Sequence, residues 1–180
     1  TLEKMPISNL FRKSGPTDAI HEIYRIIVAQ ARQPRFYTDL GVPDTVDGRF
    51  EMVTLHAFLV LRHLKRPSES ASETGQALFD VMFEDMDLSL REMGAGDMGV
   101  GKRVKAMVQA FYGRIASYEA GLDGAADLLE DALARNVYAT VDPDPANLTA
   151  MAAYVRSQDA HLRGYGRKDV ETASFAFGEA

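Results

Sequence analysis

The segment that decides the fold reads Gly48-Arg-Phe-Glu-Met-Val-Thr-Leu-His-Ala-Phe-Leu-Val-Leu-Arg-His-Leu-Lys65. One set of its apolar residues recurs every three or four positions, as on one face of a helix. That set comprises Phe50, Val53, Ala57, Val60, Leu61 and Leu64. Because Leu55, Phe58 and Leu59 add apolar side chains on other faces, the helix is apolar nearly all round. Such a helix needs neighbours on every side, so we predict that it lies at the centre of the molecule.

Helical periodicity also marks the segments on either side of this helix. The further predicted helices cover 17–32, 76–93, 100–120, 125–138 and a segment that begins at Asp144-Pro145, where Asp caps and Pro suits the first turn. No segment alternates apolar and polar residues for long enough to predict a strand. We therefore predict an all-α, single-domain bundle of five to six helices with no significant sheet. The expected parts are an N-terminal arm over 1–16, the helical domain over 17–163 and a loose C-terminal tail over 164–180.

Composition limits the classes of function that remain open. The chain has 180 residues, of which 46% are hydrophobic, so it is long enough to bury one sizeable core. Its net charge of -6 argues against a dedicated nucleic-acid binder, which needs a broad basic surface. It has no cysteine, which excludes disulfides and thiolate metal sites. No apolar run approaches the ~20 residues of a membrane span, and Thr1 to Lys13 lacks a secretory or transit pattern, so we expect a cytoplasmic protein.

Two phosphate-binding patterns overlap in the glycine-rich stretch, G-x-G-x-x-G from Gly94 and G-x-x-x-x-G-K from Gly96. In a true phosphate loop a buried strand precedes the glycines, and a Ser or Thr follows the Lys to bind Mg²⁺. Here an amphipathic helix precedes them, and Arg103 stands in place of the hydroxyl residue. We therefore expect no nucleotide, and predict that Gly94 ends one helix and Asp97 caps the next. The basic residues that follow form a candidate contact for an anionic partner: Lys102, Arg103 and Lys105.

Histidines give no metal or catalytic pattern. His56 and His63 lie seven residues apart, hence on one side of the predicted central helix, but neither has a carboxylate four residues later. We expect them to be core or interface histidines. No serine stands in a recognisable Ser/His/Asp arrangement. The sequence therefore predicts no catalytic residue, no metal and no cofactor.

Carboxylates gather on one face of the helix predicted over 76–93. We treat this acidic face, edged with apolar residues, as a candidate surface for a basic and apolar partner. The candidate residues are Asp80, Val81, Glu84, Asp87 and Leu88. The alternative is a solvated face, supported by Arg91 four residues after Asp87. Five of the eight methionines lie nearby, either as core filler or as an adaptable binding surface: Met82, Met86, Met93, Met98 and Met107.

Two longer strings carry a family resemblance. The first is Asp47-Gly-Arg-Phe-Glu-Met-Val-Thr-Leu-His-Ala-Phe-Leu-Val-Leu-Arg62. The second joins Ala77-Leu-Phe-Asp-Val-Met-Phe-Glu-Asp-Met-Asp-Leu-Ser-Leu-Arg-Glu-Met93 through the glycine stretch to Lys102-Arg-Val-Lys-Ala-Met-Val-Gln-Ala-Phe-Tyr-Gly-Arg114. Together they resemble the ubiquinol-cytochrome c chaperone family, over about residues 17 to 140. In that family the glycine stretch joins two helices and is not a nucleotide loop.

The resemblance implies an assembly factor for the cytochrome bc1 complex that holds newly made cytochrome b and is not an enzyme. Mitochondrial relatives work with a small second chaperone subunit near the ribosomal tunnel exit. The acidity of this chain and its lack of a visible targeting segment resemble a bacterial cytoplasmic member, which leaves the second subunit and the ribosome contact open. A peripheral position on the cytoplasmic face of the inner membrane is a further option.

Two alternatives from other classes remain at this point. One is a small all-α enzyme that uses Asp80, Glu84 and the nearby histidines, and the other is a lipid-binding helical bundle. An enzyme predicts a deep pocket with convergent polar groups. A chaperone predicts a broad open face with exposed apolar residues.

Overall fold

The computed structural model describes residues 16–64, 69–94 and 96–180. Apart from residue 16, the expected N-terminal arm lies outside the described residues. Every regular element in the described ranges is a helix, which confirms the all-α prediction. The helices are α1 (Pro16–Ala31), α2 (Pro34–Thr38), α3 (Val46–Leu64), α4 (Glu69–Glu92), α5 (Asp97–Asp123), α6 (Ala126–Asn136), α7 (Pro145–Leu162) and α8 (Arg167–Glu171). The sequence predicted neither α2 nor α8, and α4 begins seven residues earlier than expected.

The central position predicted for the apolar helix is confirmed. Helix α3 contacts α1, α4, α5, α7 and α8, and every side chain from Phe50 to Val60 is buried. Full burial of one large apolar side chain contributes about 1.5–3 kcal/mol. Because the helix is surrounded, the polar side chains within this stretch need partners inside the protein.

His56 is the polar residue at the middle of α3, and it is fully buried. Its Nδ1 lies 2.7 Å from the Met52 carbonyl oxygen, so Nδ1 carries the proton and donates it. Its Nε2 then accepts from the Tyr154 hydroxyl of α7 at 2.8 Å. The imidazole ring also packs on Phe36 of α2 and Phe177 near the C-terminus. His56 is therefore a core histidine, as expected, and burial lowers its pKa to about 4.

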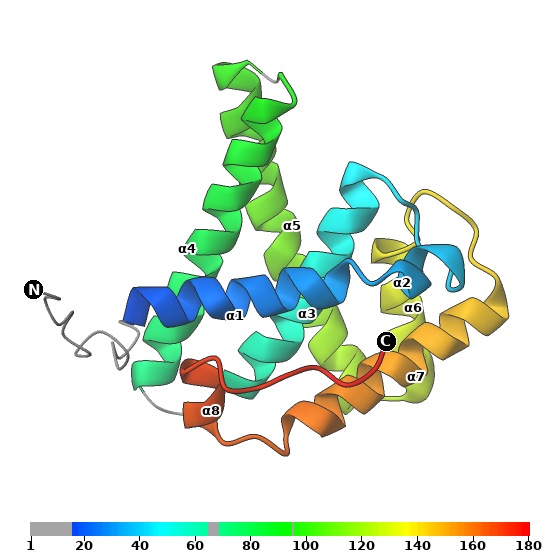
Figure 1. Ribbon diagram of the computed structural model, residues 1–180. Helices are drawn as coiled ribbons and strands as arrows, with labels where there is room; N and C mark the ends of the chain where they lie inside the picture. The colour runs from blue at the N-terminus through cyan, green and yellow to red at the C-terminus, as the bar shows by residue number, and fades with distance from the viewer. Residues whose placement is uncertain (1–15, 65–68, 95) are drawn as a thin grey trace, which may run out of the picture.

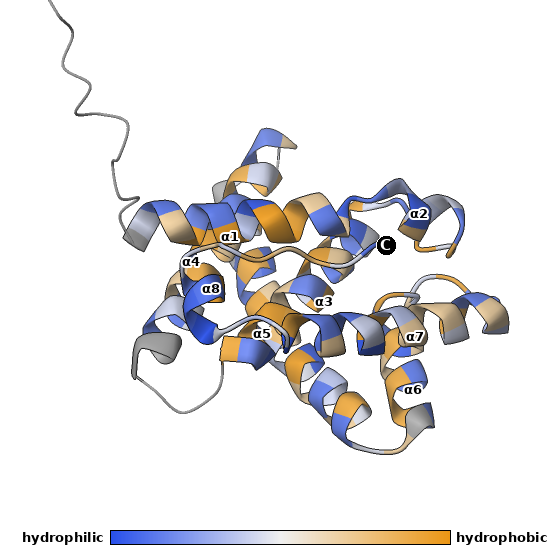
Figure 2. Ribbon diagram, turned by 60° about the horizontal axis from the view of Figure 1, so that its bottom comes forward, coloured by the Kyte–Doolittle hydropathy of each residue, from blue (hydrophilic) through white to orange (hydrophobic). Residues whose placement is uncertain are grey.

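The C-terminal segment differs from the loose tail that we expected. It runs between α1 and α7 (Figure 1; Figure 2), and Val170 and Phe175 are buried. The Gly178 amide donates to the Gln158 side chain at 2.8 Å, and its carbonyl accepts from Gln30 of α1 at 3.0 Å. The segment is extended after α8, so its apolar residues reach the core without a helical period. Absence of periodicity therefore did not mean absence of packing.

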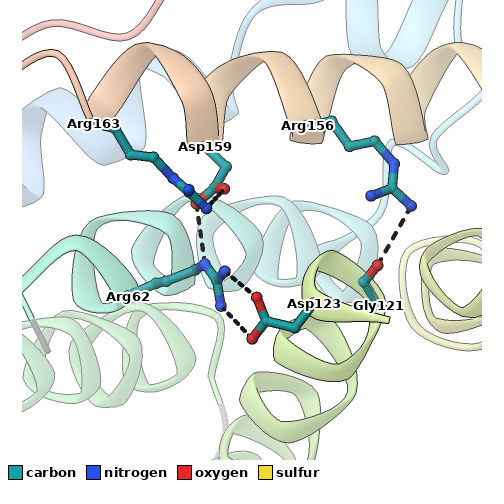
Figure 3. A network of polar contacts seen from close by, with 6 residues as sticks. All are labelled: Arg62, Gly121, Asp123, Arg156, Asp159 and Arg163. Atoms are coloured by element: carbon teal, nitrogen blue, oxygen red, sulfur yellow. Dashed lines mark hydrogen bonds and ion pairs between the residues drawn. The ribbon is translucent and has the colours of Figure 1, made fainter. Parts of the chain in front are cut away.

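An ionic network joins the C-terminal ends of three helices, α3, α5 and α7 (Figure 3). Arg62 of α3 makes a bidentate contact with Asp123 of α5, at 2.5 and 3.1 Å. Its Nε donates to Asp159 of α7 at 3.1 Å, and Asp159 also accepts from Arg163 at 2.5 Å. The Arg62 and Asp159 side chains are only 15% and 14% exposed, so solvent screens this contact less than a surface pair. The network fixes α5 and α7 relative to the central helix.

Helices α4 and α5 form a hairpin that projects beyond the other helices (Figure 1). Aromatic rings hold the two helices together, with Phe83 packed against Phe79 of the same helix and against Phe111 of α5. Gly94 has φ of +84°, which confirms that it turns the chain after α4 in the left-handed conformation. The prediction for Asp97 was wrong, because the N-cap of α5 is Gly96 and Asp97 is its first helical residue. The cap predicted at Asp144 is confirmed, since it accepts from the Ala146 amide at 2.8 Å.

Packing between α5 and α6 predicts opposite effects for two glycine substitutions in α5. A Cβ at Gly121 would lie 2.7 Å from the Leu129 Cα, so Gly121→Ala forces the helices apart. We expect a loss of about 1–3 kcal/mol in the free energy of unfolding. A Cβ at Gly113 meets no atom within 4 Å, so Gly113→Ala should stabilise the protein by about 0.5–1 kcal/mol through helix propensity. Urea unfolding measures both, and equal signs for the two variants would contradict the packing described.

Burial of His56 predicts a pH dependence of stability. The folded-state pKa of about 4 lies below the ordinary value of 6.5, so between these values the unfolded chain binds a proton that the folded chain excludes. The stability contribution is therefore complete above pH 6.5 and is lost as pH falls toward 4, by about 3 kcal/mol. Urea unfolding across this window should show a flatter pH profile for His56→Gln. The control His21→Gln, on the exposed side of α1, should keep the wild-type profile.

Candidate functional site

The acidic face predicted on α4 is largely exposed. Asp80, Glu84 and Leu88 follow one another at four-residue intervals, so they share one side of the helix, and all three are exposed. Asp87 is half-buried and binds Arg91 at 2.6 Å, as the alternative of a solvated, self-paired face anticipated. Val81 differs from the others, because it is half-buried and packs against the core. The surface available to a partner is therefore Asp80, Glu84 and Leu88, with Asp87 at its side.

Large exposed apolar side chains concentrate on the α4–α5 hairpin. Six such residues occur in the described ranges, and three of them are Leu88, Met93 and Tyr112 of the hairpin, at 55%, 56% and 59% exposed. Tyr112 also stacks near Phe79, with ring centroids 5.8 Å apart. Single exposed apolar residues are common on protein surfaces, but their concentration on one element is typical of surfaces that contact other molecules. The hairpin is thus the best candidate for a partner-binding element.

The basic residues at the start of α5 are exposed, as a contact for an anionic partner requires. Lys102, Arg103 and Lys105 all lie on the first turns of the helix. The guanidinium of Arg103 lies 3.5 Å from the Asp47 carboxylate of α3, so part of its charge is already compensated. The element that precedes the glycine stretch is α4, so the strand that a phosphate loop requires does not stand there.

A hollow that sequence reasoning missed lies between the hairpin and the body of the protein, and we call it the α1–α4 cleft. Its volume is about 170 Å³. The lining residues come from α1 (Tyr24, Val28), the α1–α2 turn (Arg32), α3 (Val46, Arg49, Phe50, Val53), α4 and its C-terminal end (Asp85, Met86, Ser89, Leu90, Met93) and α5 (Met107). The methionines were the one feature of the sequence that pointed to it, since three of the five named above line it: Met86, Met93 and Met107. Met82 and Met86 are buried as core filler, whereas Met93 is exposed at the rim. The side chain of Met98 lies outside the described residues.

A second hollow of about 300 Å³ lies between α3, α5 and α6. Its charged floor is the buried Glu51, whose two carboxylate oxygens accept from Arg114 Nε at 2.8 and 2.6 Å. Burial raises the pKa of Glu51 above its ordinary value, and the Arg114 guanidinium opposes that rise. Each charge has its partner within the protein, so the pair ties α5 to α3.

The structure does not assemble the enzyme site considered as an alternative. Asp80 and Glu84 are exposed on the hairpin, whereas His56 is buried and both of its ring nitrogens are engaged by Met52 and Tyr154. Within residues 16–64, 69–94 and 96–180, no group of three His, Asp or Glu side chains is placed to hold a metal ion. None of the helices in these ranges is long and apolar enough to span a bilayer.

Comparison with known proteins gives one consistent result. Residues 38–177 match the family described as Ubiquinol-cytochrome C chaperone. The chain is 39% identical to the Cbp3 homolog from Brucella abortus, whose crystal structure aligns over 93% of each chain with a TM-score of 0.82. It is 25% identical over 136 residues to ubiquinol-cytochrome-c reductase complex assembly factor 1 of Xenopus laevis, covering 76% of this chain and 68% of that protein. The human protein of the same name is 26% identical over 148 residues, 82% of this chain and 50% of its own length. The chain thus spans about half the length of the human relative.

The Glu51–Arg114 pair predicts a stability effect that depends on whether one partner or both are removed. Arg114→Leu leaves a buried carboxylate without its cation, which should cost about 3 kcal/mol in the free energy of unfolding at neutral pH. That cost should shrink on acidification, because a carboxyl whose folded-state pKa is raised is stable in its protonated form. Glu51→Leu combined with Arg114→Leu should recover more than half of the loss. Urea unfolding of the three chains measures this, and equal losses in the single and double variants would contradict the pairing.

Proposed function

Because the chain belongs to the ubiquinol-cytochrome c chaperone family, we propose that it is an assembly factor of the bc1 complex that binds newly made cytochrome b. It acts by holding its client and not by catalysis. The observation that carries the proposal is the projecting α4–α5 hairpin, which presents carboxylates and an exposed Leu88 on one open face. That surface matches the broad open face expected of a chaperone better than the deep polar pocket expected of an enzyme.

The chemistry of the client supports this choice of face. Cytochrome b is a multi-helix membrane protein, so its newly made segments are apolar and its cytoplasmic loops tend to carry Lys and Arg. Asp80 and Glu84 provide negative charge for such loops, while Leu88 covers apolar surface next to them. Charge then mainly sets the rate and orientation of encounter, and apolar burial mainly sets residence time.

A second contact is proposed for the start of α5. Lys102 and Lys105 present cationic groups to solvent, and Arg103 adds a third that Asp47 partly compensates. An anionic bilayer surface attracts such groups by about 1 kcal/mol each. We place the protein in the cytoplasm, with a peripheral position on the cytoplasmic face of the inner membrane when the client is there. Ribosomal RNA is the alternative anionic partner, and a small second chaperone subunit stays open.

Reversal of the exposed carboxylates tests the client face. Asp80→Lys with Glu84→Lys should keep the fold, because both side chains are exposed, and should reduce capture of cytochrome b by about tenfold. Leu88→Asp should reduce capture as well, and should do so even in about 1 M salt, where the screening length is about 3 Å. Capture is measured by co-purification of cytochrome b with the tagged chain, and assembly by the haem b spectrum of membranes.

The matched control changes the same charges elsewhere. Asp127→Lys with Asp131→Lys has the same four-residue spacing on an exposed side of α6, and should leave capture unchanged. If the α4 double variant captures cytochrome b at the wild-type level while Lys102→Glu with Lys105→Glu does not, the client face is the start of α5. If the wild-type chain itself captures no cytochrome b, the proposed client is wrong.

A further inference from the structure

The α1–α4 cleft presents apolar groups from several helices to a single opening. Phe50 and Val53 of α3 form part of its lining, and Met107 of α5 closes it from the hairpin side. At its rim Val46 is 44% exposed and Met93 is 56% exposed. Val46 belongs to α3 and Met93 to the turn after α4, and both line the same hollow, so one occupant that covers the opening removes both from water. Their burial is favourable in proportion to the apolar area covered.

The charged side chains around the cleft differ in whether they have a partner within the protein. On the α4 side the exposed Asp85 accepts a hydrogen bond from the Tyr24 hydroxyl at 2.7 Å, a neutral donor that does not compensate the charge of the carboxylate. The α1–α2 turn and α3 contribute Arg32 and Arg49, both exposed. Arg49 binds Asp44 at 2.6 Å, but no carboxylate of the described part of the chain lies within ion-pair distance of Arg32. Arg32 is therefore the cationic group of the cleft that no carboxylate of the described residues compensates, while Asp85 adds negative charge on the α4 side.

The same two arginines continue beyond the apolar hollow. They also line a polar hollow of about 420 Å³ together with Pro34, Tyr37, Thr38 and Asp44. The apolar hollow and the polar hollow are thus adjacent, and the two arginines lie at the boundary between them. This arrangement selects a ligand in which an apolar group lies directly next to an anion.

The size of the apolar hollow decides what kind of occupant it suits. Its volume of about 170 Å³ is below the range of about 300–1,000 Å³ of sites that enclose a drug-sized molecule. It is large enough for one anchoring side chain, and single apolar anchors in a pocket often dominate the energy of a protein interface. A long acyl chain would extend far outside the hollow.

We propose that the α1–α4 cleft docks a segment of a partner protein in which a bulky apolar side chain lies next to a carboxylate. The apolar side chain enters the hollow lined by Phe50, Val53 and Met107, and the carboxylate pairs with Arg32. The inference rests on the proposed function only in that an assembly factor has protein partners. The cleft is separate in chemistry from the client face of α4, which is acidic and selects basic segments.

A binding titration with the purified chain tests the cleft. The probe is a fluorescein-labelled peptide of about a dozen residues, with one Leu-Phe pair followed by two Glu in a background of Ser and Gly. We expect saturable binding by fluorescence anisotropy. Arg32→Glu should weaken it by about tenfold or more. Ser89→Trp should abolish it, because Ser89 is exposed on the cleft lining and a larger side chain there fills the hollow without removing a packed group.

Matched controls separate the cleft from general effects. Arg25→Glu lies on α1 and is 69% exposed, and Ser157→Trp lies on the exposed side of α7; both should bind the probe as wild type does. A probe with Lys in place of its two Glu should bind at least about tenfold more weakly. A probe with Ser in place of Leu-Phe should not bind.

Several outcomes would overturn the proposal. They are equal binding of the Glu and Lys probes, wild-type binding by Ser89→Trp, binding of phosphatidylglycerol vesicles through Arg32 in place of the peptide, and a wild-type dimer that Ser89→Trp converts to a monomer. The titration needs no cytochrome b. A failure to capture cytochrome b would therefore overturn the proposed function and not the cleft, and a failure to bind the probe would do the reverse.

Discussion

The whole structure depends on the burial of α3. Leaving a buried polar group without a partner costs stability, and although the Thr54 hydroxyl has no hydrogen-bond partner among the described residues, three other polar side chains of α3 bind neighbouring helices. Glu51 holds α5 through Arg114, His56 holds α7 through Tyr154, and Arg62 joins α5 and α7 at the far end of the helix. Apolar burial supplies the stability of the bundle. The contacts of Glu51, His56 and Arg62 favour the arrangement in which these three side chains have their partners.

This arrangement explains why the hairpin can project. Helix α5 is anchored to α3 at two places, by Arg114 in its middle and by Asp123 at its C-terminal end. Nearer its N-terminus the polar contact with α3 is the more exposed Arg103–Asp47 pair, 3.5 Å apart, and the first turns of α5 extend with the end of α4 beyond the body (Figure 1). The outer side of the projection is the acidic face of α4, and the inner side closes the α1–α4 cleft. The projection of the α4–α5 hairpin thus creates two surfaces of different chemistry.

Sequence reasoning succeeded where a single helix carries the signal and failed where several elements combine. The central helix, the left-handed Gly94 and the cap at Asp144 each follow from the local pattern, and each is confirmed. The short helices α2 and α8 have no room for a period, and they are held by burial of Phe36 and Val170. Val81 looked like part of the acidic face because periodicity places it beside that face, but the neighbouring helices decide that it packs inward. The cleft could not be predicted, because its lining comes from segments far apart in the chain.

The two surfaces of the hairpin suit segments of different chemistry. The outer face of α4 carries negative charge with one exposed leucine. If it is the client face, as we propose, it would recognise basic segments mainly through long-range attraction that salt weakens. The cleft carries apolar groups and Arg32, so the segment that we propose for it would be held mainly through burial of one side chain. A chaperone that uses both can capture a basic, apolar client at one face while a second segment of opposite charge occupies the other. Because the two sides share α4, an occupant that shifts Met86 or Leu90 in the cleft would also move Glu84 and Leu88 on the outer face. Binding at the two proposed sites would therefore be coupled only if the occupant of the cleft displaces α4.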